Sequence, residues 1–224
     1  MKLSKETLLI LKNFGAINDN ILFKPGNVVV TGSPVGDIYA SATVDETFPM
    51  EFGIYNLSKF LSAISLFKDS DLLFEDENFV IINGTNGSSL KYVFSEPNTL
   101  ITPPTEMDDD LPELEETFKL SSVQLDSVLK AASTLGVKDI CFISEGDNVS
   151  LVAVDLSNPS SDRFSLDIGH SSSIFSINFP VEVLKILPGD YTVGFSRTGI
   201  SNWVHSSGTV TYWIASSTTS TFED

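Results

Sequence analysis

The chain has 224 residues and a formal net charge of −17, with 13 Lys and Arg against 30 Asp and Glu. Apolar residues make up 42% and charged residues 19%, which is typical of a folded chain and excludes a disordered one. No apolar run reaches the roughly 18 residues that a membrane span needs. The single cysteine, Cys141, excludes a disulfide framework and a Cys-based zinc site. Lys12 and Asn13 interrupt the first apolar run, so we expect no signal peptide and a cytoplasmic protein.

The first hundred residues predict two helices, each followed by strands. Apolar residues recur at helical spacing over 2–14 and 56–68, which predicts amphipathic helices packed on a sheet. Turn-forming pairs such as Asn83-Gly84 separate short apolar or β-branched runs. These runs predict strands over 21–23, 28–31, 38–44, 52–55, 71–74, 79–82 and 90–94.

The middle of the chain predicts a linker. Residues 96–117 are rich in Pro and in acidic side chains, a composition that cannot form an interior strand and favours an extended connection. We therefore expect one domain over 1–100, a connecting linker over 101–116 and a second domain over 117–224.

The second half repeats the pattern of the first. Helical spacing predicts helices over 121–135 and 180–187, so the chain resembles four copies of a helix-plus-strands unit, two in each half. The polar tail, 216–224, is expected to be loose. Strands are predicted over 140–144, 149–156, 163–168, 174–179, 191–195, 203–205 and 210–215.

Charge is segregated between the predicted helices and the rest of the chain. The four helical segments hold seven Lys against three acids, whereas the remainder holds 6 bases and 27 acids. Lys on exposed helices often serves only solubility, but the matching Glu at i,i+4 spacing is missing here. The alternative is a helical surface that faces a polyanion. The net charge taken alone disfavours nucleic acid, yet a Debye length of about 8 Å screens distant acids from such a surface.

Short stretches along the chain resemble one protein family, the DNA polymerase sliding clamps of T-even-type bacteriophages. The stretches run in the same order over the whole length, although the acidic linker and the Ser/Thr-rich tail depart from the family pattern. They are Met1-Lys2-Leu3-Ser4-Lys5, Leu11-Lys12-Asn13-Phe14, Ile54-Tyr55-Asn56-Leu57, Phe60-Leu61, Ser65-Leu66, Pro97-Asn98-Thr99 and Leu187-Pro188-Gly189-Asp190-Tyr191.

The resemblance implies an α+β fold of two tandem clamp-type domains, each with two helices packed on antiparallel sheets. It implies a homotrimeric ring whose twelve helices surround double-stranded DNA without sequence specificity. The expected partners are the replicative DNA polymerase and an ATP-driven clamp loader, and further a late-transcription sigma factor and coactivator. The protein would act in the cytoplasm of a bacterial host, with no membrane partner.

The helical Lys are the candidate DNA contacts. Attraction between Lys and phosphate is nearly independent of base sequence, and no Arg, which would grip phosphate in a fork, occurs on the four segments. The candidates are Lys2, Lys5, Lys12, Lys59, Lys68, Lys130, Lys138 and Lys185.

Two further surfaces follow from the resemblance. Ring closure would pair an edge strand of each domain with one on the neighbour; the candidates are Lys91, Tyr92, Val93 and Phe94 with Asp162, Arg163, Phe164 and Ser165, although these could equally be internal strands. Partner peptides would insert apolar side chains beneath the linker; the candidates are Leu100, Ile101, Pro103, Met107, Tyr212, Ile214 and Ala215, which could instead only attach the linker to the sheet.

No constellation in the sequence points to catalysis. His170 and His205 have no partner at ligand spacing, Cys141 reads as a core residue, and the three consecutive acids of 108–110 read as solvated linker. We therefore expect no enzyme activity, cofactor or metal. The rival interpretations are a β-rich phage structural or adhesive protein and an enzyme that uses a carboxylate pair.

Overall fold

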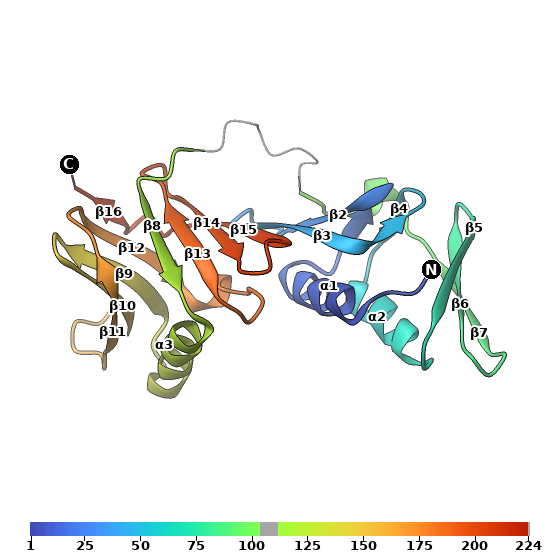
Figure 1. Cartoon of the computed structure of the whole chain (residues 1–224), viewed down its shortest axis with the longest axis horizontal. Coiled ribbons are helices and arrows are strands. Elements are labelled where there is room, and N and C mark those ends of the chain that lie inside the picture. Colours follow the sequence, from blue (N-terminus) through green and yellow to red (C-terminus); the bar gives the residue numbers. More distant parts are fainter. Residues whose placement is uncertain (104–111, 224) are drawn as a thin grey trace. The chain divides into compact units, whose positions relative to one another are not determined.

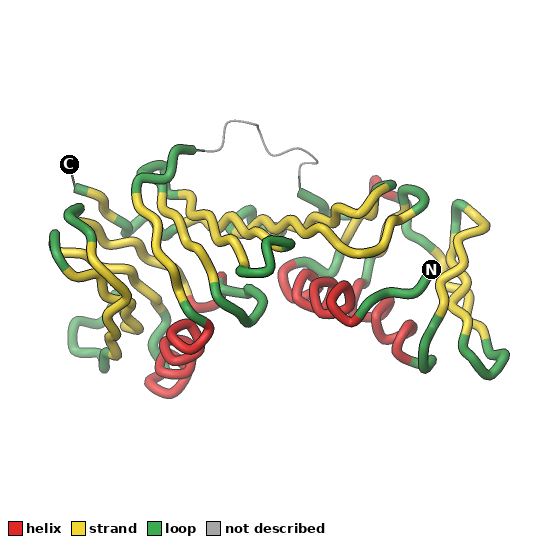
Figure 2. Tube along the Cα trace, viewed as in Figure 1, coloured by secondary structure: helices red, strands yellow, loops and turns green. Residues whose placement is uncertain are grey.

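The computed structural model describes residues 1–103 and 112–223. The chain divides into two compact units, Met1–Glu106 and Met107–Asp224. Each unit combines one or two α-helices with antiparallel strands (Figures 1 and 2). No helix in the described ranges is both long enough and apolar enough to cross a membrane.

In the first unit two helices accompany three groups of antiparallel strands. The strand pairs are β1 with β4 and β2 with β3, and the third group is a sheet of order β5-β6-β7. Helices α1 and α2 lie side by side, and α1 packs on β2 and β3 (Figure 1). The elements are α1 (Lys5–Ile17), β1 (Ile21–Phe23), β2 (Gly26–Gly32), β3 (Ile38–Phe48), β4 (Phe52–Ile54), α2 (Leu57–Ser65), β5 (Asp71–Asp76), β6 (Phe79–Asn83), β7 (Ser89–Val93) and the 3₁₀ turn η1 (Pro97–Thr99).

In the second unit one helix packs on a five-stranded sheet, and a second sheet completes the core. The five-stranded sheet has the order β11-β10-β9-β12-β16, and strands β15-β14-β13-β8 follow one another in the other sheet. Helix α3 packs on β9, β10 and β11. The elements are β8 (Glu116–Leu120), α3 (Ser122–Leu135), β9 (Asp139–Glu145), β10 (Asn148–Val154), β11 (Phe164–His170), β12 (Ile174–Pro180), the 3₁₀ turn η2 (Val181–Val183), β13 (Tyr191–Phe195), β14 (Ile200–His205), β15 (Val210–Ala215) and β16 (Thr221–Phe222).

Polar caps fix where the helices begin. The Ser4 hydroxyl accepts the Thr7 N–H at 3.1 Å, and the Asn56 side chain accepts the Lys59 N–H at 2.6 Å. At α3, Ser121 and Gln124 form a reciprocal capping box, which satisfies two of the amides that a helix start leaves open. Gly136 ends α3 in the left-handed region at φ 69°, where a side chain would be strained.

Aromatic side chains dominate both cores. In the first unit the Phe52 ring stacks on Phe23 and on Phe94, with centroids 4.6 and 4.7 Å apart. In the second unit Phe142 meets Phe195 edge-on at 4.8 Å, and Trp203 is fully buried. Each unit thus has a hydrophobic core of its own, which holds its helices against its strands.

The prediction of a fourth helix, over 180–187, is wrong. Residues 180–187 form only the 3₁₀ turn η2, and Leu184 already leaves the helical region at φ −77°, ψ 51°. Two β-branched valines, Val181 and Val183, disfavour a helix that is too short to nucleate by itself. Val183 and Leu184 are buried all the same, so tertiary packing explains the apolar pattern. The described residues of the second unit therefore hold one α-helix, not the two that we expected.

Two strands, β8 and β16, were not predicted from the sequence. Strand β8 begins at Glu116, at the end of the predicted linker, and pairs with β13. Strand β16 lies in the tail that we expected to be loose, and pairs with β12. The Phe222 ring stacks on Phe175 at 5.5 Å and lies under the Arg197 guanidinium. These contacts fix the tail to the second unit.

Candidate nucleic-acid and partner interfaces

The helices of the first unit bury one face and leave Lys on the other. Helix α1 buries Thr7, Ile10, Leu11, Phe14 and Ile17, whereas α2 buries Leu57, Phe60, Ala63 and Ile64. Lys5 and Lys12 on α1 and Lys59 on α2 are exposed, as are the flanking Lys2 and Lys68. The two helices and the residues that flank them thus present five ammonium groups to solvent.

A shallow hollow of about 440 Å³ lies between α1 and α2, lined by Leu8, Lys12, Ser58, Leu61, Ser62 and Ser65. Two serine hydroxyls of this hollow donate to backbone carbonyls of α2. Ser62 donates to the Ser58 carbonyl at 2.8 Å, and Ser65 donates to the Ser62 carbonyl at 2.7 Å. The Ser58 hydroxyl donates to Asp19. With these protons engaged, Lys12 is the group in this hollow that attracts an anion.

The second unit places its candidate Lys differently. Lys130 is exposed on α3, whereas Lys138 follows α3 and Lys185 follows η2, both exposed but outside the helices. Lys138 shares a hollow of about 610 Å³ with Asp139, Asp155 and Glu182. Hydrogen bonds from Ser157, and then the charge of Lys138, hold the pKa of Asp155 below its usual range. Lys138 thus faces carboxylates of its own chain.

Six of the other candidate Lys form no ion pair among the described residues. Within residues 1–103 and 112–223, none of Lys2, Lys5, Lys12, Lys59, Lys68 and Lys130 forms an ion pair with a carboxylate. Within the described ranges their charge is therefore not neutralised by an ion pair, and it is available to an external anion.

The two strands predicted to close the ring lie at the edges of their sheets. Among the described strands, β7 pairs only with β6 and β11 only with β10. On β7, Tyr92 meets Phe60 edge-on at 5.0 Å, whereas Val93 is 63% exposed. Before and along β11, Asp162, Arg163 and Ser165 are exposed and Phe164 is half-buried. Both segments therefore leave backbone groups open on one side.

The start of the predicted linker is attached to the first unit. A Cβ on Gly53 would lie 2.8 Å from Leu100, and a Cβ on Gly32 would lie 2.9 Å from Pro103, so both glycines allow close approach. Ile101 between them is 60% exposed. Of the residues predicted for the pocket at this point, Leu100 and Pro103 thus pack against the first unit, whereas Ile101 is exposed. Met107 lies outside the described residues.

Of the three predicted pocket residues on β15, only Ala215 is exposed. Tyr212 and Ile214 are fully buried, and the Tyr212 hydroxyl accepts the Leu187 N–H at 3.1 Å. Burial also raises the pKa of Tyr212 far above its usual value. Both side chains therefore belong to the core. Because side chains alternate along a strand, Trp213 and Ala215 lie on the opposite face.

A small apolar hollow of about 110 Å³ lies on that opposite face, lined by Pro112, Leu114, Ile200, Asn202 and Trp213. Leu114 packs directly on β13, where a Cβ on Gly194 would lie only 2.6 Å from it. Sequence reasoning missed this set, although the alternation of β15 held the signal: Trp213 is the large apolar residue on the face opposite Tyr212 and Ile214.

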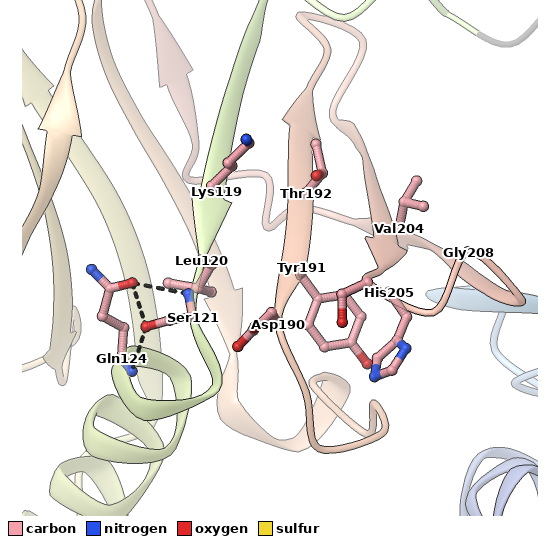
Figure 3. A pocket seen from close by; sticks show the side chains of 11 residues that line it. Lys119, Leu120, Ser121, Gln124, Asp190, Tyr191, Thr192, Val204, His205 and Gly208 are labelled. Carbon is pink, nitrogen blue, oxygen red and sulfur yellow. Dashed lines mark hydrogen bonds between the residues drawn. The ribbon is translucent and has the colours of Figure 1, made fainter. Parts of the chain in front are cut away.

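A larger hollow of about 520 Å³ lies where β8 ends and α3 begins (Figure 3). Asp190 accepts the Ser122 N–H at 2.7 Å, and hydrogen bonds from Ser122 hold the pKa of Asp190 below its usual range. The His205 ring meets Tyr191 edge-on and contacts the Ser207 hydroxyl at 2.8 Å. The contact of Asp190 thus holds the start of α3, and that of His205 holds the turn after β14.

The described ranges contain a buried cysteine and no cluster of metal-binding side chains. Cys141 is fully buried, and burial raises the pKa of its thiol to about 12, which leaves it protonated and unreactive. No group of three or more His, Cys, Asp and Glu in those ranges is placed to hold a metal ion.

Comparison with known proteins identifies the family. A family model described as DNA polymerase processivity factor matches residues 4–87. The sliding clamp of Vibrio phage KVP40 is 32% identical over 96% of this chain and 98% of its own length. The sliding clamp of Enterobacteria phage T4 is 27% identical over 85% of each chain.

Solved structures agree on the fold. The PCNA in the structure "C-terminal region of FEN-1 bound to A. fulgidus PCNA" has a TM-score of 0.70 at 14% identity, covering 96% of each chain. PCNA from Thermococcus kodakaraensis has a TM-score of 0.68 at 16% identity, covering 95% of this chain and 96% of that one. The chain therefore belongs to the sliding clamps, or DNA polymerase processivity factors, of T-even-type bacteriophages.

Proposed function

We propose that this sliding clamp closes as a homotrimeric ring around double-stranded DNA and tethers the replicative polymerase for processive synthesis. The observation that carries the proposal is the exposed, unneutralised Lys on α1, α2 and α3 of a chain with a net charge of −17. The rival interpretation, a β-rich structural or adhesive protein, does not predict this distribution of charge.

The chemistry of these Lys suits sliding. An ammonium group attracts phosphate without reading the bases, and its hydrated charge holds phosphate loosely. The strands and loops carry most of the acids, so DNA is repelled by surfaces other than the helical ones. Lys130 and the five Lys around α1 and α2 are the main contacts in this proposal, and Lys185 and Lys138 contribute less.

Ring closure is proposed to join β7 of one protomer to the segment Asp162–Ser165, which leads into β11 of the next. β7 and β11 are edge strands among the described residues, and pairing would satisfy their open backbone groups. Clamp-type chains assemble with one another in a related structure, the PCNA2-PCNA3 complex from Sulfolobus tokodaii, which has a TM-score of 0.67 at 15% identity.

A cross-link tests this closure. The variant Tyr92→Cys/Phe164→Cys should form disulfide-linked dimers and trimers under mild oxidation, whereas either single variant should remain monomeric on a denaturing gel. Native Cys141 does not interfere, because it is buried. Absence of cross-linked species in a sample that is trimeric in solution would place the interface elsewhere.

Two surfaces, one in each unit, are proposed to bind partner peptides: the start of the linker in the first unit and the hollow around Trp213 in the second. Ile101 is exposed in the first unit, and Leu114, Ile200 and Trp213 line the hollow in the second. The A. fulgidus relative binds the C-terminal region of FEN-1, which supports short peptide segments as ligands. Within the same proposal, an ATP-dependent clamp loader opens the ring, and a late-transcription sigma factor and coactivator use the ring in the host cytoplasm.

Retention on DNA tests the proposal as a whole. Rings loaded onto nicked circular DNA should remain bound at high salt and should be lost when the circle is cut once, because a topological link does not depend on charge. Class averages from negative-stain electron microscopy should show a flat ring with a central hole. Loss at high salt from intact circles, or solid particles without a hole, would refute encirclement.

A further inference from the structure

The backbone of Ile101 is fixed on both sides by side-chain amides. Its N–H donates to the Asn20 Oδ1 at 2.9 Å, and its carbonyl accepts a hydrogen from the Asn18 Nδ2 at 2.7 Å. The side chain is 60% exposed all the same. The backbone that carries this apolar side chain is thus held in place, while the side chain itself remains in water.

The two asparagines are themselves anchored. Asn18 is the C-cap of α1 and is buried, and its Nδ2 also donates to the Gly32 carbonyl at 2.9 Å. The Asn20 side chain donates to the Tyr55 carbonyl at 2.7 Å, and the Asn20 N–H donates to the Asn18 Oδ1 at 2.9 Å. Side chains that are bound at both ends lose little further freedom when a ligand arrives.

Folding alone does not explain this arrangement. Leu100 and Pro103 already attach the segment to β4 and β2 through Gly53 and Gly32. Ile101 adds little apolar burial in return for the ordering of its backbone. A residue that is ordered but exposed gains its apolar contact only when another molecule covers it.

We propose that Asn18 and Asn20 are positioning residues that hold Ile101 as a preformed apolar anchor for a partner peptide. The inference rests on the proposed function, in which replication proteins bind the clamp through short segments. The occupant is an extended peptide with apolar anchor side chains and no excess of acid, since it must approach a chain of net charge −17. The peptide-bound A. fulgidus relative supports an occupant of this kind.

A double-mutant cycle on the full-length clamp tests the proposal. The probe is a fluorescein-labelled synthetic peptide of the C-terminal residues of the cognate replicative polymerase, with binding measured by fluorescence anisotropy. Ile101→Ala should weaken binding about tenfold, as for a central apolar anchor, and Asn20→Ala about fivefold. The double variant should bind no more weakly than Ile101→Ala alone, because Asn20 acts through Ile101.

Two further variants separate positioning from loss of structure. Asn20→Asp keeps an acceptor oxygen for the Ile101 N–H and should retain more affinity than Asn20→Ala. Asn86→Ala is the matched control, since Asn86 caps a turn of the same unit through Ser88 and should bind as the wild type does. Thermal unfolding should show that all variants remain folded.

Hydrogen exchange supplies a readout that does not depend on the peptide. Exchange of the segment that contains the Ile101 amide should become faster in Asn20→Ala and stay unchanged in Asn86→Ala. Additive losses in the cycle, or full affinity together with faster exchange, would overturn the inference and leave the proposed function intact. A wild-type clamp that binds no polymerase peptide would instead contradict the proposed partner site, and the inference with it.

Discussion

The variant Lys12→Ala/Lys59→Ala offers the sharpest test of the helical Lys. Lys12 lines the hollow between α1 and α2, and Lys59 is exposed on α2. In the proposed trimer the two substitutions remove six ammonium groups. Each phosphate contact contributes about 0.9 to the slope of log K against log salt. Complete loss of these contacts would therefore lower the slope by about 5, which corresponds to about 10³-fold in affinity over a fourfold rise in salt.

The assay is fluorescence anisotropy of a short labelled duplex, which can thread into preassembled rings from its ends, measured from low to physiological salt. The matched control is Lys24→Ala/Lys119→Ala, which removes the same charge from two exposed positions outside the helices. The control should shift the slope little. An equal fall in slope for the two double variants would refute the reasoning, because net charge and not the helical face would then govern binding.

Three further predictions concern the second unit. Cys141, with its pKa raised to about 12, should not react with a disulfide reagent near pH 8 until the chain is denatured; rapid reaction of the native protein would contradict its burial. Ser121→Ala breaks the capping box of α3 and should lower the free energy of unfolding by about 1 kcal/mol, whereas Ser127→Ala on the same helix should change it by less than about 0.5 kcal/mol. The pKa of Asp190 is lowered in the folded state by Ser122, so its ionised form stabilises the fold above the unfolded pKa, and this stabilisation is lost as the pH falls through the folded pKa. The difference in unfolding free energy between wild type and Asp190→Asn should therefore be present near neutral pH and vanish in acid; a difference that persists at low pH would point to a cause other than charge.

The sequence was sufficient for those elements whose local and tertiary signals agree. Helices α1, α2 and α3 each combine an apolar stripe with a capping side chain, Ser4, Asn56 and Ser121, and all three were predicted within a few residues. Strands bounded by turns, such as β13 and β15, were predicted with the bounds that the structure has. An element can be predicted from the sequence when its local signals and its tertiary packing favour the same structure.

The failures have physical causes of two kinds. Residues 180–187 carry apolar residues at helical spacing, but the burial of Val183 and Leu184 comes from tertiary packing, which periodicity does not distinguish from a helix. The second cause is strand parity. On β15 a shift of one residue exchanges Tyr212 for Trp213, and with it the core face for the open face. Apolar character alone does not show which face of the strand lines a pocket.

The distribution of charge explains how an acidic protein can serve as a clamp for an acidic polymer. Lys5, Lys12, Lys59 and Lys130 lie on helices without carboxylate partners among the described residues, so their fields act at short range, within the about 8 Å of a Debye length. The acids of the strands and loops dominate at longer range and weaken any contact of DNA with those surfaces. Attachment through charge alone would then be weak, and a closed ring would supply the persistence that charge does not. In the proposed ring, the acids of the strands and loops would favour release once the ring opens, because they repel the DNA.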